Sequence, residues 1–295
     1  MPVRKGVIPV AGFGTRFLPA SKAVPKVLMP IVDRPVIQYA VEEMARAGIE
    51  QICLVMSHGQ GAIADHFSPA LELEAALEAS GKDDLLAAIR APEELADIFY
   101  VLQPRPLGLG HAVWCARQFV NDEPFAVILP DELFDPADNF LGEMMEMFEE
   151  RSASMVAGMV VPHEQISRYG VLDPEDPVAD PVRIRTLIEK PPADEAPSDI
   201  AIVGRYVLEG AVMDALAKVK PGAIGEIQLT DALDMLAQQG RLFGTRYRGR
   251  RWDVGNIPGF LRANFDLGGE RQELAWTVAG TGPGALPGGP SAPGS

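Results

Sequence analysis

A glycine-rich loop near the start of the chain carries residues that could act on phosphate groups. The segment GFGTRFLPASKAVPK, residues 12–26, follows a short apolar run. Gly12 and Gly14 let the backbone approach a ligand and present N–H groups to an anion. Arg16 can bind phosphate oxygens with its planar fork of donors, and Lys26 adds a point charge. We therefore predict that the loop binds phosphate rather than forming only a tight turn.

Two well-known phosphate loops do not match this segment. A dinucleotide-binding loop requires G-x-G-x-x-G, but the third position is Phe17, which is too bulky for close packing of a helix on the preceding strand. Pro19 and Pro25 also prevent a helix from following directly. The P-loop pattern G-x-x-x-x-G-K-[ST] is absent from the sequence. The missing third glycine argues against a nicotinamide-dependent dehydrogenase.

Two aspartates are candidates for a metal site. Asp131 follows the apolar run FAVILP, and Asp253 lies in RWDVG. Ligands of α/β proteins bind at the carboxyl ends of strands, although Asp131 alone could equally be a turn residue. Paired with Asp253, it becomes a candidate for Mg²⁺, which binds one or two carboxylates and completes its shell with phosphates and water. The four histidines lack metal-ligand spacing, so we expect no zinc site.

The first half of the chain alternates between apolar runs and helical patterns. The predicted strands are residues 6–10, 51–57, 98–104 and 124–132. The predicted helices are residues 36–48, 60–97 and 108–120. Near-continuous apolar strands are typical of a parallel sheet that is buried on both faces. The pattern predicts an α/β, Rossmann-like fold, although Pro9 is unusual in a central strand because it has no N–H group to donate.

The second half predicts antiparallel additions to this sheet. Extended runs occupy residues 153–162, 169–191 and 199–208, and prolines and aspartates separate them in places. A helix is predicted over residues 225–240 (GEIQLTDALDMLAQQG), with a structural role, and another over about 258–267. We therefore expect a mostly parallel mixed sheet flanked by helices, in a single domain of residues 1–270. Residues 271–295 are rich in Gly, Pro and Ser and are predicted to be disordered.

Composition limits the classes of partner. The chain has 295 residues and a formal net charge of −15. Nonspecific binding to nucleic acid or to anionic lipid needs a basic surface, so neither partner is expected. No apolar run is long enough to span a bilayer, and no signal peptide is expected before the first strand. Two cysteines do not make a disulfide framework in a chain of this length, so we expect reduced thiols and a cytoplasmic protein.

Several segments together resemble the sugar-nucleotide pyrophosphorylases, which are nucleotidyltransferases that act on sugar 1-phosphates. They occur in the same order over nearly all of residues 3–267 and include GFGTRFLPASKAVPK, QPRPLGLGHAVWCA, VILPDELF, RYGVLD, IEKP, GEIQLTDAL and RWDVGN. Within that family, the chain is most similar to bacterial members that use UTP and glucose 1-phosphate. It departs from the family at Val27, where relatives carry an acid, and in the stretch 57–67.

The resemblance implies a nucleotidyltransferase fold and a Mg²⁺-dependent reaction. UTP and glucose 1-phosphate give UDP-glucose and pyrophosphate by in-line attack on the α-phosphorus, without a covalent protein nucleophile. It also implies a nucleotide-binding half, about residues 1–135, and a sugar-binding half, about residues 136–270. A homo-oligomer, dimer or tetramer, is expected by the same resemblance.

The resemblance also implies roles for individual residues. Arg16 neutralises the triphosphate, Lys26 holds the sugar phosphate, and Asp131 and Asp253 share one Mg²⁺, whereas Glu132 points elsewhere. The residues expected to bind the nucleotide, with the last two reading the base, are Ala11, Gly12, Gly14, Thr15, Gln103 and Gly108. Those expected to bind the sugar and its phosphate are Gly170, Glu189, Lys190 and Val203.

Two alternatives stay open at this level. The same reaction could use another base or sugar, such as dTTP or galactose 1-phosphate, because one amide and backbone contacts do not obviously exclude a thymine methyl. A nucleotide-sugar binding module without activity would require a damaged cation or metal site, and the sequence contains none.

Overall fold

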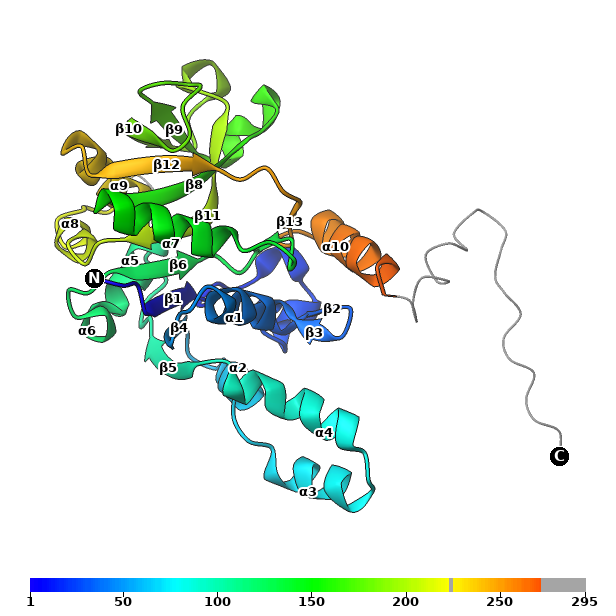
Figure 1. The fold of residues 1–295 in the computed structure, drawn as a ribbon. Coiled ribbons are helices and arrows are strands. Elements are labelled where there is room, and N and C mark those ends of the chain that lie inside the picture. Colours follow the sequence, from blue (N-terminus) through cyan, green and yellow to red (C-terminus); the bar gives the residue numbers. More distant parts are fainter. Residues whose placement is uncertain (223–224, 272–295) are drawn as a thin grey trace, which may run out of the picture.

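A mixed sheet runs through the molecule with helices on both faces (Figure 1). The structure is a computed structural model that describes residues 1–222 and 225–271. Within these ranges, the main sheet has nine strands, which run from a parallel side to a largely antiparallel side. The tail predicted to be disordered lies, from residue 272 onward, outside the described residues.

One side of the sheet is parallel, as the sequence predicts. Its strands are β5 (Asp97–Leu102), β4 (Gln51–Met56), β1 (Lys5–Pro9) and β6 (Phe125–Ile128). Pro9 is tolerated because it is the last residue of β1, and β6 pairs with that strand only through residues 5–7. The loop of residues 12–26 therefore leaves from the carboxyl end of a central strand.

The other side of the sheet is largely antiparallel. Its strands are β8 (Ser154–Val160), β9 (Gly170–Pro174), β10 (Val182–Glu189), β11 (Ile200–Leu208) and β12 (Leu242–Arg246). Strand β11 joins the two sides, because it pairs antiparallel with β6 and with β8. The ladder between β11 and β8 shifts register between Ile202 and Tyr206, next to Gly204. The order across the whole sheet is β5-β4-β1-β6-β11-β8-β12-β10-β9. This confirms the predicted mixed sheet with added antiparallel strands, in which antiparallel pairings are at least as numerous as parallel ones.

The strand predicted over residues 124–132 is interrupted. Strand β6 ends at Ile128, and a separate strand β7 (Glu132–Phe134) pairs antiparallel with β13 (Arg251–Asp253) in a small second sheet. Residues 129–131 form the connection, so Asp131 lies beyond the carboxyl end of β6. The pairing of β7 with β13 brings Asp253, from late in the chain, to the same place.

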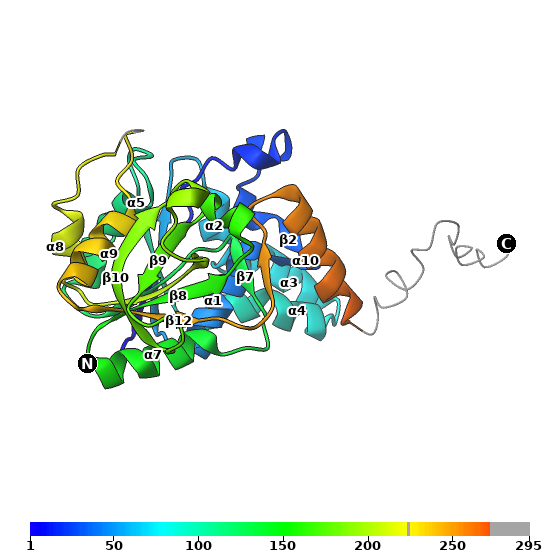
Figure 2. The same ribbon diagram turned by 90° about the horizontal axis from the view of Figure 1, so that it is seen from above.

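Two apolar clusters anchor the helices on opposite faces of the sheet (Figures 1 and 2). On one face lie α5 (Leu109–Cys115), α8 (Val212–Leu216) and α9 (Leu229–Gln238). On the other face lie α1 (Val36–Arg46) and α7 (Phe140–Arg151). A short α6 (Arg117–Val120) follows α5, and α10 (Ile257–Gly269) packs near the β2–β3 hairpin (Pro30–Ile31 and Arg34–Pro35).

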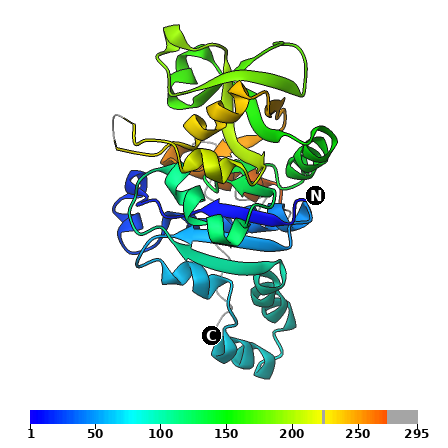
Figure 3. The same cartoon turned by 90° about the vertical axis from the view of Figure 1, so that its left-hand side faces the viewer.

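The region predicted to be helical over residues 60–97 forms three α-helices and a 3₁₀ helix (Ala91–Glu94). The α-helices are α2 (Gly61–His66), α3 (Leu71–Ala79) and α4 (Asp83–Arg90). The α3–α4 pair projects from the body of the molecule beyond edge strand β5 (Figures 1 and 3). None of the helices within the described residues is both long and apolar enough to cross a bilayer.

A buried ion pair ties β11 to helix α1 beneath the end of β6. The Arg205 guanidinium, 1% exposed, donates to both carboxylate oxygens of Glu43 at 2.7 and 2.8 Å. It also donates to the carbonyl of Leu129 at 3.3 Å and lies over the ring of Phe134. These contacts hold the backbone that leads into Asp131, so Arg205 positions the edge at which the candidate residues meet.

Replacing Arg205 by methionine should lower the free energy of unfolding by about 3–5 kcal/mol, because the Glu43 carboxylate would stay largely buried without a partner. Urea denaturation measures this. The control is Arg262→Ala, which removes an exposed pair with Asp266 and should change stability by no more than about 0.5 kcal/mol. Equal effects of the two changes would contradict the role given to Arg205.

Candidate active site

A cavity of about 530 Å³ opens where the two sides of the sheet meet. It is lined by residues that follow the carboxyl ends of β1, β5, β6 and β10 and by residues of β11, the expected position of a ligand site in an α/β sheet. A second cavity of about 280 Å³, lined by Gly12, Gly14 and Lys26, shares Leu129 and Asp131 with the first. The glycine loop and the larger cavity therefore form one continuous site.

The glycine loop folds Lys26 back against its own start. Gly14 has a φ of +62°, a conformation that favours glycine, and a Cβ there would lie 2.9 Å from the Cβ of Lys26. The Ser21 hydroxyl donates to the Gly14 carbonyl at 2.8 Å and closes the turn. Arg16, in a 3₁₀ turn over Thr15–Phe17, is exposed and lines the larger cavity. The two cations predicted from this loop thus reach the same site.

The other predicted residues of the nucleotide-binding loop differ in exposure. Gly12 lines the smaller cavity, and a Cβ added there would have no atom within 4 Å. Ala11 is buried, whereas Thr15 is exposed. Open backbone at Gly12, in the cavity that Lys26 also lines, suits the approach of an anion.

The two aspartates predicted as metal ligands converge, as expected. A Cβ added to Gly255 would lie 2.8 Å from Asp253 Oδ1 and 3.0 Å from Asp131 Oδ2, so both carboxylates face one point. Asp131 Oδ2 also accepts from Lys26 Nζ at 3.0 Å. Asp253 is fixed by the side chain of Asn256, at 2.7 Å, and by the Gly255 N–H.

These oxygen donors fit a hard divalent cation. Two carboxylates suit Mg²⁺, which takes its remaining ligands from substrate phosphates and water. Among residues 1–222 and 225–271, no group of three or more His, Cys, Asp or Glu side chains is arranged to hold a metal. A cation bound by Asp131 and Asp253 would therefore complete its shell with phosphate oxygens and water.

Glu132 does not point elsewhere, and that prediction is wrong. Its side chain lines the larger cavity and pairs with Arg251 Nη1 at 2.7 Å. The pKa of Glu132 is raised to about 8, chiefly by burial; the charge of Arg251 opposes the shift, and the charges of Asp131 and Asp253 add to it. Because β7 pairs with β13, Glu132 lies opposite Asp253. Side chains alternate between the two faces of a strand, and that of Glu132 is on the face toward the cavity.

The predicted sugar-binding residues meet at the other end of the cavity. Glu189 Oε2 accepts from the Thr230 hydroxyl at 2.7 Å, and its Oε1 lies 3.1 Å from Lys190 Nζ. A Cβ on Gly170 would lie 3.1 Å from Glu189 Oε2, so the glycine keeps this carboxylate uncovered. Val203 differs from the other three, because its side chain is fully buried in the core and its neighbours in β11 line the cavity instead.

Sequence reasoning missed part of this wall. The sequence predicts that GEIQLT is the structural start of a helix over residues 225–240, but α9 begins only at Leu229. The preceding residues lie along the 108–110 turn: Ile227 N–H donates to Leu107 O at 2.7 Å, and Gly110 N–H donates to Ile227 O at 2.8 Å.

Side chains of this segment line the cavity at Glu226, Gln228 and Thr230. Their spacing of two residues is a strand-like alternation that could have revealed them. Arg168 and Tyr169 also line the cavity without having been predicted.

The two residues predicted to read a base lie beside each other at the end of β5. Gly108 lines the larger cavity. Gln103 is 7% exposed and does not line it directly; its Nε2 donates to the Gly108 carbonyl at 3.1 Å and lies 3.0 Å from His111 Nδ1. The side-chain amide of Gln103 is therefore held by Gly108 and His111, which follow it in the chain.

Gly108 is required by the backbone at this turn. Its φ is +97°, and a Cβ would lie 2.8 Å from the carbonyl oxygen of Ile227. We expect Gly108→Ala to lower the free energy of unfolding by about 2–4 kcal/mol, from backbone strain plus the clash. Gly59→Ala is the matched control: φ is +81° there but no atom lies within 4 Å, so only the strain, about 1 kcal/mol, should remain. Equal losses in urea denaturation would contradict the clash.

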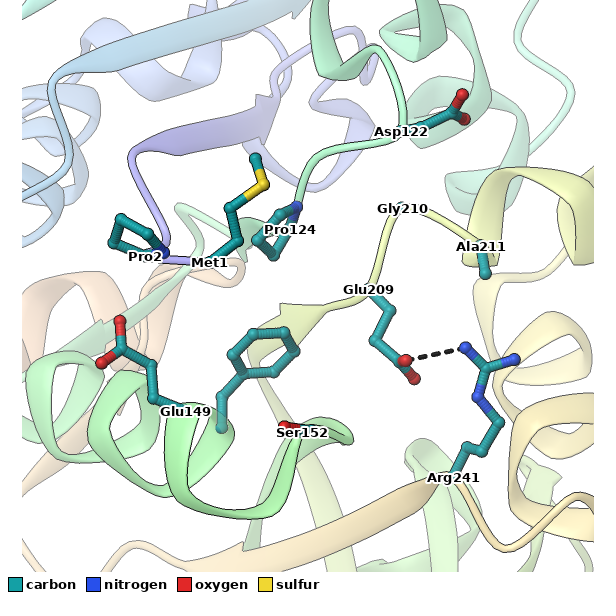
Figure 4. A pocket seen from close by; sticks show the side chains of 11 residues that line it. Met1, Pro2, Asp122, Pro124, Glu149, Ser152, Glu209, Gly210, Ala211 and Arg241 are labelled. Atoms are coloured by element: carbon teal, nitrogen blue, oxygen red, sulfur yellow. Dashed lines mark hydrogen bonds and ion pairs between the residues drawn. The ribbon is translucent and has the colours of Figure 1, made fainter.

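A further cavity, of about 690 Å³, is lined by Met1, Pro2 and Pro124 (Figure 4), which precede β1 and β6. It shares no lining residue with the cavity that Asp131 lines. Its charged side chains are Asp122, Glu149, Glu209 and Arg241, and the only cation among them pairs with Glu209 at 2.7 Å. Arg241 is thus already paired, whereas the side chain of Arg16, which lines the cavity of about 530 Å³, makes no ion pair with the described residues and can meet a phosphate. That cavity at the carboxyl ends of the strands, with the adjoining one that Lys26 lines, is therefore the candidate active site.

Comparison with known proteins gives a consistent result. The family model described as Nucleotidyl transferase matches residues 5–269. A Bacillus subtilis (strain 168) protein named UTP–glucose-1-phosphate uridylyltransferase is 45% identical over 272 residues, covering 92% of this chain and 93% of its own length.

Solved structures agree in fold. A UTP-bound UGPase from Acinetobacter baumannii is 39% identical, with a TM-score of 0.87 over 94% of this chain and 97% of that one. A UDP-glucose pyrophosphorylase complexed with UDP-glucose is 35% identical, with a TM-score of 0.83 over 91% of this chain and 100% of that one. These similarities confirm the predicted nucleotidyltransferase fold.

Proposed function

The chain belongs to the nucleotidyl transferase family, and on that basis we propose that it transfers the uridylyl group of UTP to glucose 1-phosphate. The products are UDP-glucose and pyrophosphate. The observation that carries this proposal is the meeting of Arg16 and Lys26 with Asp131 and Asp253 at one edge of the sheet, within reach of Glu189. Structures of relatives that were solved with UTP and with UDP-glucose favour UTP and glucose 1-phosphate as substrates over dTTP or galactose 1-phosphate.

The chemistry brings two anions together. A phosphate oxygen of glucose 1-phosphate attacks the α-phosphorus of UTP, the new P–O bond forms, and the bond to the β-phosphate oxygen breaks with its electron pair leaving on pyrophosphate. Positioning and charge neutralisation supply most of the rate enhancement in such a transfer. Arg16 neutralises charge on the triphosphate, and Lys26, largely buried beside Asp131, holds the incoming sugar phosphate.

Asp131 and Asp253 would hold Mg²⁺, which supplies charge neutralisation at the phosphates. The convergence of their carboxylates beside Gly255 supports this assignment. Lys26 shares Asp131 with the metal position, so the ammonium and the cation would flank the same phosphate groups.

The nucleotide-binding half comprises about residues 1–135. Backbone at Ala11, Gly12 and Gly14, with Thr15, lines the nucleotide, and Gln103 and Gly108 read the base. The positive φ of Gly14 and the open space at Gly12 support these roles.

The sugar-binding half comprises about residues 136–270. Glu189 accepts hydrogen bonds from sugar hydroxyls, and Lys190 holds phosphate. Gly170 and Val203 contribute backbone only, which agrees with the buried side chain of Val203 and the space left beside Glu189 by Gly170.

We further propose a cytoplasmic homo-oligomer, dimer or tetramer. The two cysteines are free thiols, which suits a reducing compartment. Edge strand β5 exposes Phe99, Tyr100 and Leu102 by 39–47%, and an exposed apolar edge favours pairing with another chain. Light scattering on the purified protein measures the oligomeric state.

A substrate panel tests the reaction. Initial rates of pyrophosphate release are measured with Mg²⁺ for UTP, dTTP and ATP, each with glucose 1-phosphate and with galactose 1-phosphate. The proposal expects the highest kcat/KM for UTP with glucose 1-phosphate. No release at saturating UTP and glucose 1-phosphate would reject it, and a higher value for another pair would change the substrate but keep the reaction.

A further inference from the structure

The amide of Gln103 is oriented by two protein acceptors. Its Nε2 lies 3.1 Å from the carbonyl oxygen of Gly108. A carbonyl oxygen only accepts hydrogen bonds, so the nitrogen of the amide, not its oxygen, must face Gly108. The same Nε2 lies 3.0 Å from His111 Nδ1. Because an amide nitrogen only donates, Nδ1 must be the unprotonated nitrogen of a neutral ring, with the proton on Nε2.

The surroundings of His111 favour that neutral ring. Burial and the charge of Arg117 both lower its pKa. Cys115, one turn further along α5, lies 3.9 Å from the ring nitrogens, and the ring of Trp114 stacks beside it. Burial also raises the pKa of the Cys115 thiol, so it is uncharged near neutral pH and adds no anion that would draw a second proton to His111.

Both amide hydrogens of Gln103 are thus directed at protein atoms, and only Oε1 is left for a ligand. An acceptor pairs with the N3–H group of uracil or thymine, whereas cytosine carries an unprotonated, accepting N3 at that position. We propose that His111 is a positioning residue that locks the Gln103 amide in its acceptor orientation and so makes the site select uracil-type bases over cytosine. This inference rests on the base-reading role of Gln103 within the proposed function.

The hydrogen bond between His111 and Gln103 sets how much base discrimination should be lost without His111. Without His111, one amide hydrogen loses its partner in a nearly buried place, so only the Gly108 carbonyl still holds the amide and less energy is needed to turn it toward a cytosine. A lost orienting hydrogen bond of this kind costs at least about 1 kcal/mol, so discrimination should fall at least about fivefold. The base lies away from the reacting phosphorus, so the change should appear in binding and KM rather than in kcat.

The test compares binding of UTP and CTP by calorimetry, together with kcat for UTP, in four proteins: wild type, His111→Leu, His111→Asn and His58→Ala. His58 is an exposed histidine in another loop and serves as the control. In His111→Leu the ratio of the two dissociation constants should fall at least about fivefold, with kcat within about threefold of wild type. His111→Asn, which can place an acceptor oxygen near the Nδ1 position, and His58→Ala should keep the wild-type ratio.

An unchanged ratio in His111→Leu, or an equal loss in His111→Asn, would overturn the inference. Nitrogen NMR of the wild-type His111 ring near neutral pH is a second test that needs no variant: the inference expects a proton on Nε2 only, and a proton on Nδ1 would overturn it. Calorimetry requires no turnover. UTP binding without pyrophosphate release would therefore reject the proposed reaction, while the binding ratio would still decide on His111.

Discussion

Replacing Arg16 by alanine should lower kcat for UDP-glucose formation by about 10³-fold, with little loss of stability. Arg16 is exposed and lines the cavity, so its removal leaves no buried group unpaired. Removal of a preorganised cation or donor from a charge-developing transition state costs roughly 10²–10³ in rate, and phosphoryl-transfer arginines contribute up to about 10⁵. Steady-state kinetics and a urea titration measure the two effects.

Arg4→Ala is the matched control, because Arg4 is also exposed but makes only a surface pair with Glu50, far along the sheet from the loop. It should retain wild-type kcat. Arg16→Lys keeps the charge but loses the planar fork, so it should recover only part of the rate. Turnover of Arg16→Ala within about threefold of wild type would contradict a catalytic role and favour a nucleotide-sugar binding module instead.

Replacing Asp131 by asparagine should lower kcat/KM by at least about 10²-fold and shift the Mg²⁺ dependence to higher concentration. The change keeps the shape of the side chain but removes one of two carboxylates that face the same point, and it removes the charge that pairs with Lys26. Two carboxylates are the protein ligands available to a cation at this point, so replacing one of them should weaken its binding.

Rates measured over a range of Mg²⁺ concentrations, at fixed UTP and glucose 1-phosphate, test this prediction. Asp97→Asn is the control, since Asp97 is exposed at the start of β5, at the opposite end of that strand from the site. An unchanged Mg²⁺ dependence in Asp131→Asn would contradict the assignment of Asp131 as a ligand, whatever the loss of rate.

The parts of the fold that depend on local pattern could be predicted from the sequence. Continuous apolar runs identified the parallel strands, and the glycine loop and Asp131 were placed at their carboxyl ends, where both are found. Positions that follow such strands share one edge of the sheet whatever the details of packing. This is why Arg16, Lys26 and Asp131 could be expected to meet.

The parts that depend on long-range pairing could not be predicted. The side chain of Glu132 faces the site because β7 pairs with β13, a strand from much later in the chain. Glu132 and its partner Arg251 are 119 residues apart in the sequence. The extended start of GEIQLT is held by backbone contacts to Leu107 and Gly110, which compete with its helical propensity. The orientation of the Gln103 amide depends in the same way on His111, a contact that no sequence pattern specifies.

The position of bond cleavage tests the central claim most directly. UTP labelled at the α-phosphorus is incubated with the protein, glucose 1-phosphate and Mg²⁺, and the products are separated. The account predicts that all of the label that leaves UTP is recovered in UDP-glucose, with one unlabelled pyrophosphate released for each UDP-glucose formed. Label in free UMP or in pyrophosphate, or no conversion of UTP, would contradict it.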